Sequence, residues 1–169
     1  IANNNNLLVV EDAAHAFGSS YKGKKIGSFN HLTCFSFDPI KNITCGTGGA
    51  IAFQDDSLID LISQRRYLGI DKDPWTRHQN EECWFYDVVG DGYRYHMSDI
   101  NAAIGLVQLS RFKSMNERKR EVAMRYDEAF GEISGIQLLR NNGYHDIGLF
   151  LYTLLIKKNR NKLIDLLHR

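Results

Sequence analysis

The sequence has few cysteines and lacks long hydrophobic runs, and both shortages exclude whole classes of protein. Its three cysteines, Cys34, Cys45 and Cys83, are odd in number and form no CxxC pair. This argues against a disulfide framework and a zinc site, and it favours a reducing, cytoplasmic setting. No apolar run approaches the length of a membrane span, and no signal peptide is apparent. We therefore expect no membrane association.

An excess of charge of one sign is also missing. The 169 residues include 21 Lys and Arg against 20 Asp and Glu, which leaves a net charge of +1. Nucleic acids and anionic membrane surfaces attract proteins with a clear positive excess, so we expect neither as the main partner. With 43% hydrophobic and 24% charged residues, the composition is that of a globular domain or of a large piece of one.

The two ends of the sequence lack the usual boundary signals. The chain begins with Ile1 in place of methionine. It stops at "NKLIDLLHR", inside an amphipathic helical pattern that no C-capping glycine closes. We therefore expect a segment truncated from a longer protein.

Short apolar runs, turns and helical patterns follow one another along the chain and indicate an α/β fold. The run "LLVV" at residues 7–10 is continuous and apolar, as in a parallel strand covered on both faces. The patterns predict further strands at residues 31–37, 48–53 and 149–156, and helices at 57–68, at 98–130 and in the final segment. They also predict a short helix at 11–18 ended by Gly18, a small hairpin within 21–30, and a long loop at 69–92.

The helix predicted from residue 98 onward has the clearest pattern. Ser98 is a good N-cap, and one apolar stripe follows it, made of Ile100, Ala103, Ile104 and Val107. The helical pattern continues to about residue 130 and becomes increasingly charged. Residues 131–148 are rich in Gly and Asn, and we interpret them as the boundary between a first part, 1–130, and a second part, 131–169.

Polar residues follow two of the predicted strands. Asp12 follows the first strand, and Ser36 and then Lys41 come at the end of the second. In open α/β sheets, ligands bind outside the carboxyl edge of the strands. A lysine amine forms a Schiff base with an aldehyde, and pyridoxal phosphate is the common aldehyde cofactor that needs one. Taken alone, however, Asp12 could equally cap a helix, and Lys41 could be a solvated surface charge.

Two blocks of sequence carry a resemblance. These are "VVEDAAHAFGSSYKGKKIGSFNHLTCFSFDPIKNITCGTGGAIAF" and "GYRYHMSDINAAIGLVQL", which together span most of residues 7–130. In both blocks the chain resembles the DegT/StrS family of pyridoxal-phosphate sugar aminotransferases. The resemblance implies a fold-type-I aminotransferase with a mixed, mostly parallel sheet. Residues 1–130 would belong to its large cofactor-binding domain, and residues 131–169 would begin the small C-terminal α+β domain.

The resemblance also implies an activity and partners. The family acts as a homodimer and moves an amino group from glutamate to a keto group of a nucleotide-linked sugar. Relatives that carry histidine in place of the Schiff-base lysine dehydrate sugars instead. This chain has Lys41 at that position, so the resemblance favours transamination.

Site residues follow from the same resemblance, position by position. Lys41 resembles the Schiff-base lysine, and Asp12 the aspartate that pairs with the pyridinium nitrogen of the cofactor. Ser36 resembles the serine that binds its phosphate. His15 falls where the family has Gln or His, beside the cofactor ring and its phenolic oxygen; alternatively, it could simply pack a short helix. Asn42 is expected to shape the loop and not to touch substrate.

The segment "GYRYHMSD" departs from the pattern. Many relatives read "GYNYRMSD", and their asparagine reaches across the dimer to the cofactor phosphate of the neighbour. Arg94 stands at that position, and His96 replaces the usual arginine. A guanidinium suits a phosphate dianion, so we expect Arg94 to bind the cofactor across the dimer, with a solvated loop arginine as the alternative.

There are two alternatives to an aminotransferase for the whole chain, of which the first stays open and the second is disfavoured. The chain could be a non-catalytic or truncated relative that survives as a dimerisation or binding module. A nucleotide-binding Rossmann domain is disfavoured because "EDAAHAFG" contains no GxGxxG motif.

Overall fold

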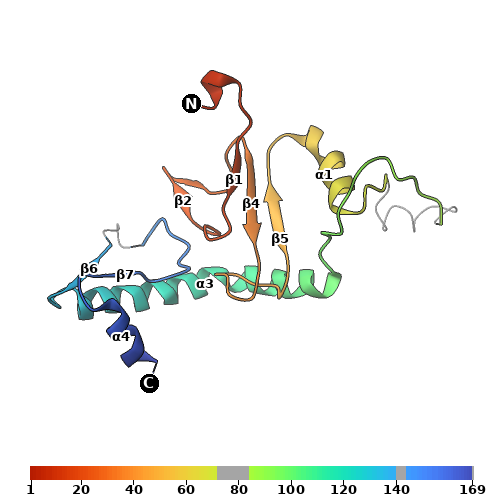
Figure 1. Ribbon diagram of the computed structural model, residues 1–169. Helices are drawn as coiled ribbons and strands as arrows, with labels where there is room; N and C mark the ends of the chain where they lie inside the picture. The colour runs from red at the N-terminus through yellow and green to blue at the C-terminus, as the bar shows by residue number, and fades with distance from the viewer. Residues whose placement is uncertain (72–83, 140–143, 169) are drawn as a thin grey trace.

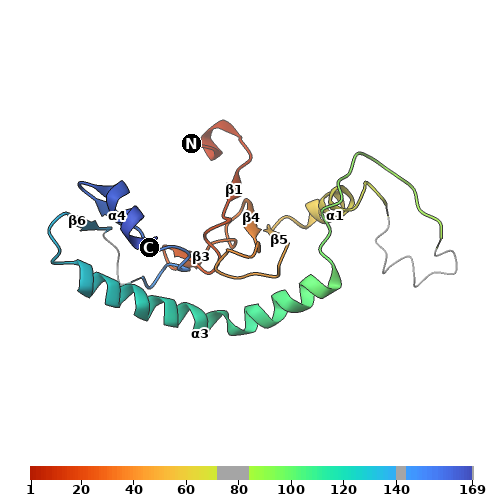
Figure 2. The same ribbon diagram turned by 60° about the horizontal axis from the view of Figure 1, so that its bottom comes forward.

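The computed structural model describes residues 1–71, 84–139 and 144–168. One long helix, α3 (Asp99–Phe130), forms the base of the molecule. A small sheet stands on the helix, and the N-terminus lies beyond the sheet, away from the helix (Figures 1 and 2). In the view of Figure 1 the C-terminus lies on the other side of α3. The predicted long loop lies partly outside the described residues, because Pro74, Trp75 and their neighbours fall in the gap.

The sheet on α3 is mixed, as predicted. Within the described residues it has three strands in the order β1 (Val10–Asp12), β4 (Leu32–Ser36) and β5 (Gly49–Ala52). β1 runs parallel to β4, whereas β5 runs antiparallel to β4. The strands predicted at 31–37 and 48–53 are thus confirmed to within one residue at each end.

The first strand begins three residues later than predicted and ends two residues later. The apolar run at 7–10 contributes only Val10 to β1, and Leu8 is 95% exposed. β1 needs a hydrogen-bonding partner, and β4 begins only at Leu32, which pairs with Val10. The apolar run correctly predicts a strand in this region. The first residue of that strand, however, is set by the start of β4, which supplies its hydrogen-bonding partner.

The short helix predicted at 11–18 is wrong. Two tight turns replace it, with the amide of Ala16 donating to Ala13 O and that of Ser19 to Ala16 O. Gly18 does not end a helix. A Cβ there would lie 2.2 Å from the ring of Phe112, so the glycine makes room for α3. The predicted hairpin follows as β2 (Ser20–Tyr21) and β3 (Lys24–Lys25).

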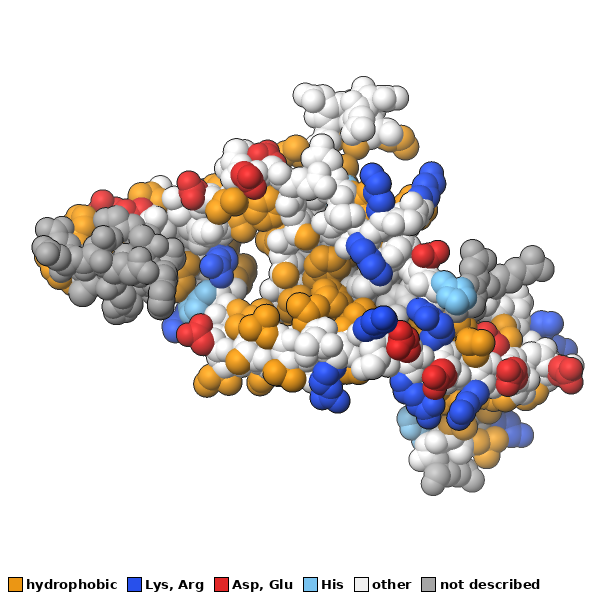
Figure 3. Space-filling model, turned by 180° about the vertical axis from the view of Figure 1, so that it is seen from behind, with side chains coloured by type: hydrophobic (Ala, Val, Ile, Leu, Met, Phe, Trp, Pro, Cys, Tyr) orange, Lys and Arg blue, Asp and Glu red, His pale blue; other side chains and the backbone are white. Residues whose placement is uncertain are grey.

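Helix α3 begins as predicted, with Ser98 accepting a hydrogen bond from the amide of Asn101. The apolar stripe does not face the sheet, however, and Ile100 is 76% exposed. The face of α3 turned inward carries a mixed set of less exposed residues at helical spacing: Asn101, Gly105, Gln108, Phe112, Asn116, Lys119 and Ala123. Figure 3 shows hydrophobic side chains over the first half of α3 and charged ones over its second half.

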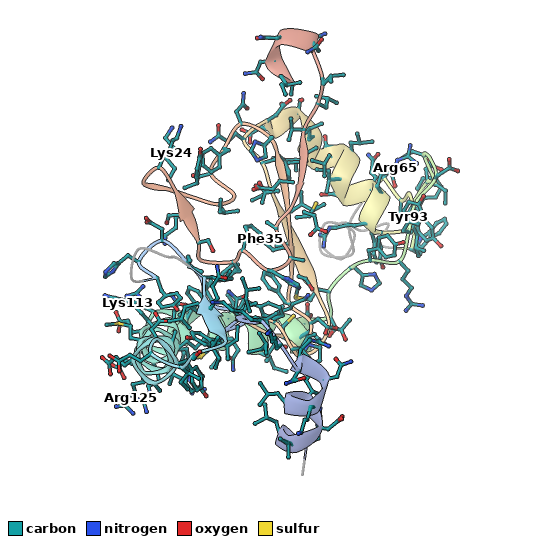
Figure 4. All side chains as sticks on the ribbon, turned by 60° about the vertical axis from the view of Figure 1, so that its left-hand side comes forward. Lys24, Phe35, Arg65, Tyr93, Lys113 and Arg125 are labelled. Carbon is teal, nitrogen blue, oxygen red and sulfur yellow. The ribbon has the colours of Figure 1, made fainter. Side chains whose placement is uncertain are left out.

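Aromatic rings join the sheet to α3. Phe17 makes edge-to-face contacts with Phe35 of β4, with Phe37 and with Phe112 of α3, at centroid distances of 5.5, 5.6 and 5.1 Å. Figure 4 shows Phe35 where the sheet meets the helix, whereas Lys24 and Arg65 lie at the periphery. These rings form an apolar contact between the sheet and the helix.

The remaining elements lie on either side of the sheet. The helix predicted at 57–68 is present as η2 (Asp56–Leu58) followed by α1 (Ile59–Arg66), and a further short helix, η1 (Asn3–Asn5), opens the chain. No helix of the described residues is long and apolar enough to cross a membrane.

After α3 come β6 (Ile136–Leu138), β7 (Leu154–Ile156) and α4 (Arg160–Leu167). The strand predicted at 149–156 is shorter than expected, because only its last three residues pair with β6. β6 lies inside the stretch interpreted as a boundary, so the sequence analysis missed it. The division at residue 130 stays a prediction.

Candidate active site

The register of the sheet places Asp12 and Ser36 on one face. Asp12 pairs with Cys34 across the parallel ladder, and Ser36 lies two residues beyond Cys34 on the same strand. Side chains that pair directly, or that are two apart on a strand, share a face. The opposite face confirms this alternation, because Thr33 Oγ1 donates to Glu11 Oε2 at 3.0 Å there.

Lys41 lies in the loop of residues 37–48 that joins β4 to β5, called the lysine loop below. Its base is closed by two backbone hydrogen bonds, from Phe37 N to Gly48 O at 2.8 Å and from Cys45 N to Phe37 O at 3.0 Å. Asn101 of α3 adds a further tether, since its Nδ2 donates to Cys45 O at 2.6 Å. The loop therefore holds Lys41 in a defined place just beyond the ends of β1 and β4.

The amine of Lys41 meets the ring of His15. Lys41 Nζ and His15 Nε2 lie 2.8 Å apart, a hydrogen bond whose direction follows from the tautomer of the ring. His15 reaches this place because the turn after β1 is fixed by Asp12, whose Oδ1 accepts from the amide of Ala14 at 3.1 Å. No helix follows Asp12, so the alternative reading of this residue as a helix cap is wrong.

Phe150 completes this group, and the sequence analysis missed it. Its ring stacks on that of His15 with centroids 4.1 Å apart and planes inclined by 30°. Lys41 Nζ lies 5.3 Å from the centroid of the same ring, within the range of a cation–π contact. No local signal could have found Phe150, because it lies 109 positions after Lys41 in a run that resembles a strand.

Asn42 shapes the lysine loop, as expected. Its side chain is 98% buried, and its Nδ2 donates to Phe17 O at 2.7 Å and to Gly148 O at 3.4 Å. Its backbone oxygen accepts from Lys119 Nζ of α3 at 3.3 Å. Burial lowers the pKa of Lys119 below its ordinary value. Asn42 thus joins the loop both to the turn after β1 and to the segment that carries Phe150.

Arg94 is not brought to this group within the chain. Its backbone forms an isolated bridge with Tyr67, and its exposed side chain lines a hollow of about 850 Å³. Thr47 and Gly48 at the end of the lysine loop line the same hollow, but Lys41 and His15 do not. His96 lies nearby and packs edge-on against Tyr67 at 4.9 Å.

The structure therefore brings four of the five predicted site residues to one edge of the sheet. Lys41 and His15 are in contact, and Asp12 and Ser36 share a face at the ends of adjacent strands. A primary amine, an imidazole, a carboxylate and a hydroxyl are gathered there. This set can hold a small molecule that carries a carbonyl group, a basic nitrogen and an anionic group.

A family model matches the whole chain, and known proteins match most of it. A model of the DegT/DnrJ/EryC1/StrS aminotransferase family matches residues 1–169. The spore coat polysaccharide biosynthesis protein SpsC from Bacillus subtilis is 38% identical over 160 residues, which cover 94% of this chain and 41% of SpsC.

Solved structures resemble the chain as well. The sugar aminotransferase CalS13 from Micromonospora echinospora superimposes with a TM-score of 0.78 at 33% identity, over 96% of this chain and 42% of CalS13. The PLP-form of Spr1654 from Streptococcus pneumoniae gives a TM-score of 0.78 at 31% identity, over 96% of this chain and 41% of Spr1654.

The chain spans less than half the length of each of these proteins. Over that part, the predicted fold-type-I aminotransferase fold is confirmed by the likeness to solved sugar aminotransferases. The family model covers every residue and contains both sequence blocks that carry the resemblance. The chain is a member of the DegT/DnrJ/EryC1/StrS aminotransferase family.

Proposed function

We propose that the complete protein is a pyridoxal-phosphate-dependent aminotransferase that moves an amino group from glutamate to a keto group of a nucleotide-linked sugar. The observation that carries the proposal is the group of side chains at the sheet edge, in which the amine of Lys41 lies 2.8 Å from His15 Nε2. Family membership supports the class of reaction. The likeness to a polysaccharide biosynthesis protein and to a sugar aminotransferase supports a sugar as acceptor.

The residues present fit pyridoxal phosphate by their chemistry. Lys41 offers the primary amine that its aldehyde needs, and the Asp12 carboxylate can pair with its pyridinium nitrogen. The Ser36 hydroxyl can donate to its phosphate. Asp12 and Ser36 lie on the same face at the ends of neighbouring strands, so one bound molecule could contact both. His15, next to Lys41, would lie beside the cofactor ring.

When bound, the cofactor supplies an electron sink that stabilises negative charge on the carbon next to the transferred nitrogen. Lys41 would act as the general base and acid, taking a proton from that carbon and returning it elsewhere. His15 holds the lysine amine in place through its Nε2 atom. The ring of Phe150 covers one face of the His15 ring and lies 5.3 Å from the lysine amine.

The proposal also includes the oligomeric state of the protein and the role of Arg94. Because Arg94 is exposed and lines a hollow beside the far end of the lysine loop, it is free to reach a second copy of the chain. We propose a homodimer in which Arg94 binds the cofactor phosphate of its neighbour. A cytoplasmic location agrees with the unpaired thiols of Cys34 and Cys45.

The decisive experiment identifies the lysine that binds the cofactor covalently. The complete protein is mixed with pyridoxal phosphate, reduced with borohydride and digested. The masses of the peptides are then measured by mass spectrometry. We expect the cofactor on the peptide that contains Lys41. In a separate, unreduced sample of the protein, formation of 2-oxoglutarate from glutamate is measured with and without a keto nucleotide-sugar. A protein that takes up no cofactor would instead support the non-catalytic binding or dimerisation module.

A further inference from the structure

The contact between Phe150 and His15 is built by a distant part of the chain. Phe150 ends a segment of residues 144–150, called the strap below, which has no regular secondary structure. In Figure 1 this part of the chain, in blue, forms an arch that comes down to α3 at the foot of the sheet, before the chain continues along α3 into β7. It reaches the sheet edge from the far end of α3, where Tyr144 contacts Asp127.

Hydrogen bonds from α3 fix the strap along its length. At its beginning, Tyr144 donates from its hydroxyl to both carboxylate oxygens of Asp127 at 2.9 Å. Further along, Asn116 holds two neighbouring peptides, accepting from Leu149 N at 2.9 Å and donating to Ile147 O at 3.2 Å. Asn116 is only 9% exposed, and buried hydrogen bonds of this kind are costly to break.

The turn after β1 holds the strap from the other side. Ser20 N donates to Asp146 O at 2.8 Å, and Gly148 N donates to Ser19 Oγ at 2.9 Å. A Cβ on Gly148 would lie 1.9 Å from Phe17 O, so only glycine allows the strap to come this close. The same turn carries His15. These contacts join the strap to residues 17–20, the segment that directly follows His15, and so bring the rings of Phe150 and His15 to the same place.

We propose that Phe150 is a positioning residue, which fixes the orientation of the His15 ring and, through that ring, the place of the Lys41 amine. The His15 side chain is otherwise exposed, and within the described residues its ring has two partners, Phe150 on its face and Lys41 at Nε2. A ring bound only at one nitrogen can swing about its χ angles. A ring stacked at 4.1 Å cannot do so without losing the stacking.

The test observes His15 directly and needs no turnover. The complete protein, before addition of pyridoxal phosphate, is labelled with carbon-13 at the Cε1 atoms of its histidines, and their NMR signals are recorded. A His15→Gln variant identifies the His15 signal. In the wild type, Lys41→Ala should shift that signal. In Phe150→Ala, the signal should move to the position of a free exposed imidazole, and Lys41→Ala should no longer shift it.

Two further variants sharpen the test. Phe150→Tyr keeps the ring and should restore the wild-type signal together with its response to Lys41→Ala. Where Phe150→Ala fails to fold, Phe150→Leu keeps most of the apolar volume and should give the same loss. An unchanged His15 signal that still responds to Lys41→Ala, in either Phe150→Ala or Phe150→Leu, overturns the proposal.

A second histidine offers a matched control. The ring of Phe29 stacks on that of His31 with parallel planes and centroids 5.7 Å apart. Phe29→Ala should move the His31 signal and leave that of His15 unchanged, and Phe150→Ala should do the reverse. If both variants moved both signals alike, Phe150 would act on overall stability and the proposal would fail. Because no readout depends on transamination, a failure of the proposed function would be seen separately.

Discussion

Asn101, in the first turn of α3, donates from its Nδ2 to the backbone oxygen of Cys45 at 2.6 Å and to that of Thr47 at 3.1 Å. The two acceptors lie on the turn that closes the lysine loop. A side chain 56 positions away from Cys45 thus satisfies the carbonyl group of Cys45 and adds a second donor to Thr47 O, which also accepts from Cys45 Sγ at 3.5 Å. The start of the long helix and the loop that presents Lys41 are therefore one structural unit.

Removing the Asn101 side chain should loosen the lysine loop. Asn101→Ala removes the donor to Cys45 O and one of the two donors to Thr47 O, which we expect to lower the free energy of unfolding by about 1–3 kcal/mol. Denaturant unfolding of the complete protein measures this loss. Hydrogen exchange should rise in the peptides that contain residues 42–48.

The control for Asn101 is Asn5, whose Nδ2 donates to Ile1 O in an exposed place. Asn5→Ala should change the free energy of unfolding by no more than about 0.5 kcal/mol. Equal losses in the two variants would contradict a special role for Asn101.

Lys41→Ala should abolish turnover. Without the amine the cofactor has no covalent attachment and the proton has no carrier, so the rate should fall by several orders of magnitude. The measurement is the transfer of the amino group from glutamate to a keto nucleotide-sugar. Lys24→Ala, at an exposed position on β3, serves as the control and should keep the wild-type rate. Near-normal turnover in Lys41→Ala would contradict the assignment of Lys41 as the Schiff-base lysine.

Asp12→Asn removes the negative charge of this side chain and keeps its size. Asparagine keeps an oxygen that can accept from the amide of Ala14, so the turn that carries His15 should persist and the cofactor should still bind. Without the negative charge the pyridinium is no longer stabilised, and turnover should fall steeply. Cofactor binding is measured by its absorbance, and turnover as for Lys41.

Asp55 provides a matched control for Asp12. Its Oδ1 also accepts from an amide two residues ahead, that of Ser57, and hydrogen bonds from Ser57 lower the pKa of its carboxyl group. Asp55→Asn should leave turnover unchanged. Unchanged turnover in Asp12→Asn as well would leave Asp12 with a local structural role alone.

Gly148→Ala should push the strap away from the sheet edge. The new Cβ would collide with Phe17 O, and we expect a loss of about 1–3 kcal/mol in the free energy of unfolding, as for other overpacked sites. Gly90→Ala is the control, because a Cβ there meets nothing within 4 Å. Thermal or denaturant unfolding compares the two variants. If Gly148→Ala were as stable as Gly90→Ala, the close approach of strap and turn would not exist in solution.

The proposed role of Arg94 predicts complementation between subunits. Lys41→Ala and Arg94→Ala proteins should each be nearly inactive. In a mixed dimer, one of the two sites would combine an intact Lys41 from one chain with an intact Arg94 from the other, so a fraction of the activity should return after subunit exchange. If Arg94 served its own chain, each site would retain one lesion and no activity would return. Full activity of Arg94→Ala alone would remove the residue from the site.

Local sequence was enough to determine several elements. β4, β5, α1 and α3 were predicted to within a few residues, and Ser98 caps α3 as expected. These features depend on short-range chemistry, namely apolar runs between turn residues, helical spacing and a hydroxyl that accepts from a nearby amide. The two motif blocks likewise identified the family, because its pattern of residues is itself local in the chain.

The tertiary structure alone decided how these parts meet. Where β1 begins depends on the start of β4, and α3 turns a largely polar face inward because Asn101, Asn116 and Lys119 find backbone carbonyls and amides there. The pairing of Lys41 with His15 depends on the turn after β1, and the place of Phe150 on a strap more than a hundred residues further on. Hydrogen bonds and ring contacts between distant residues leave no periodicity in the sequence, so only the folded chain shows them.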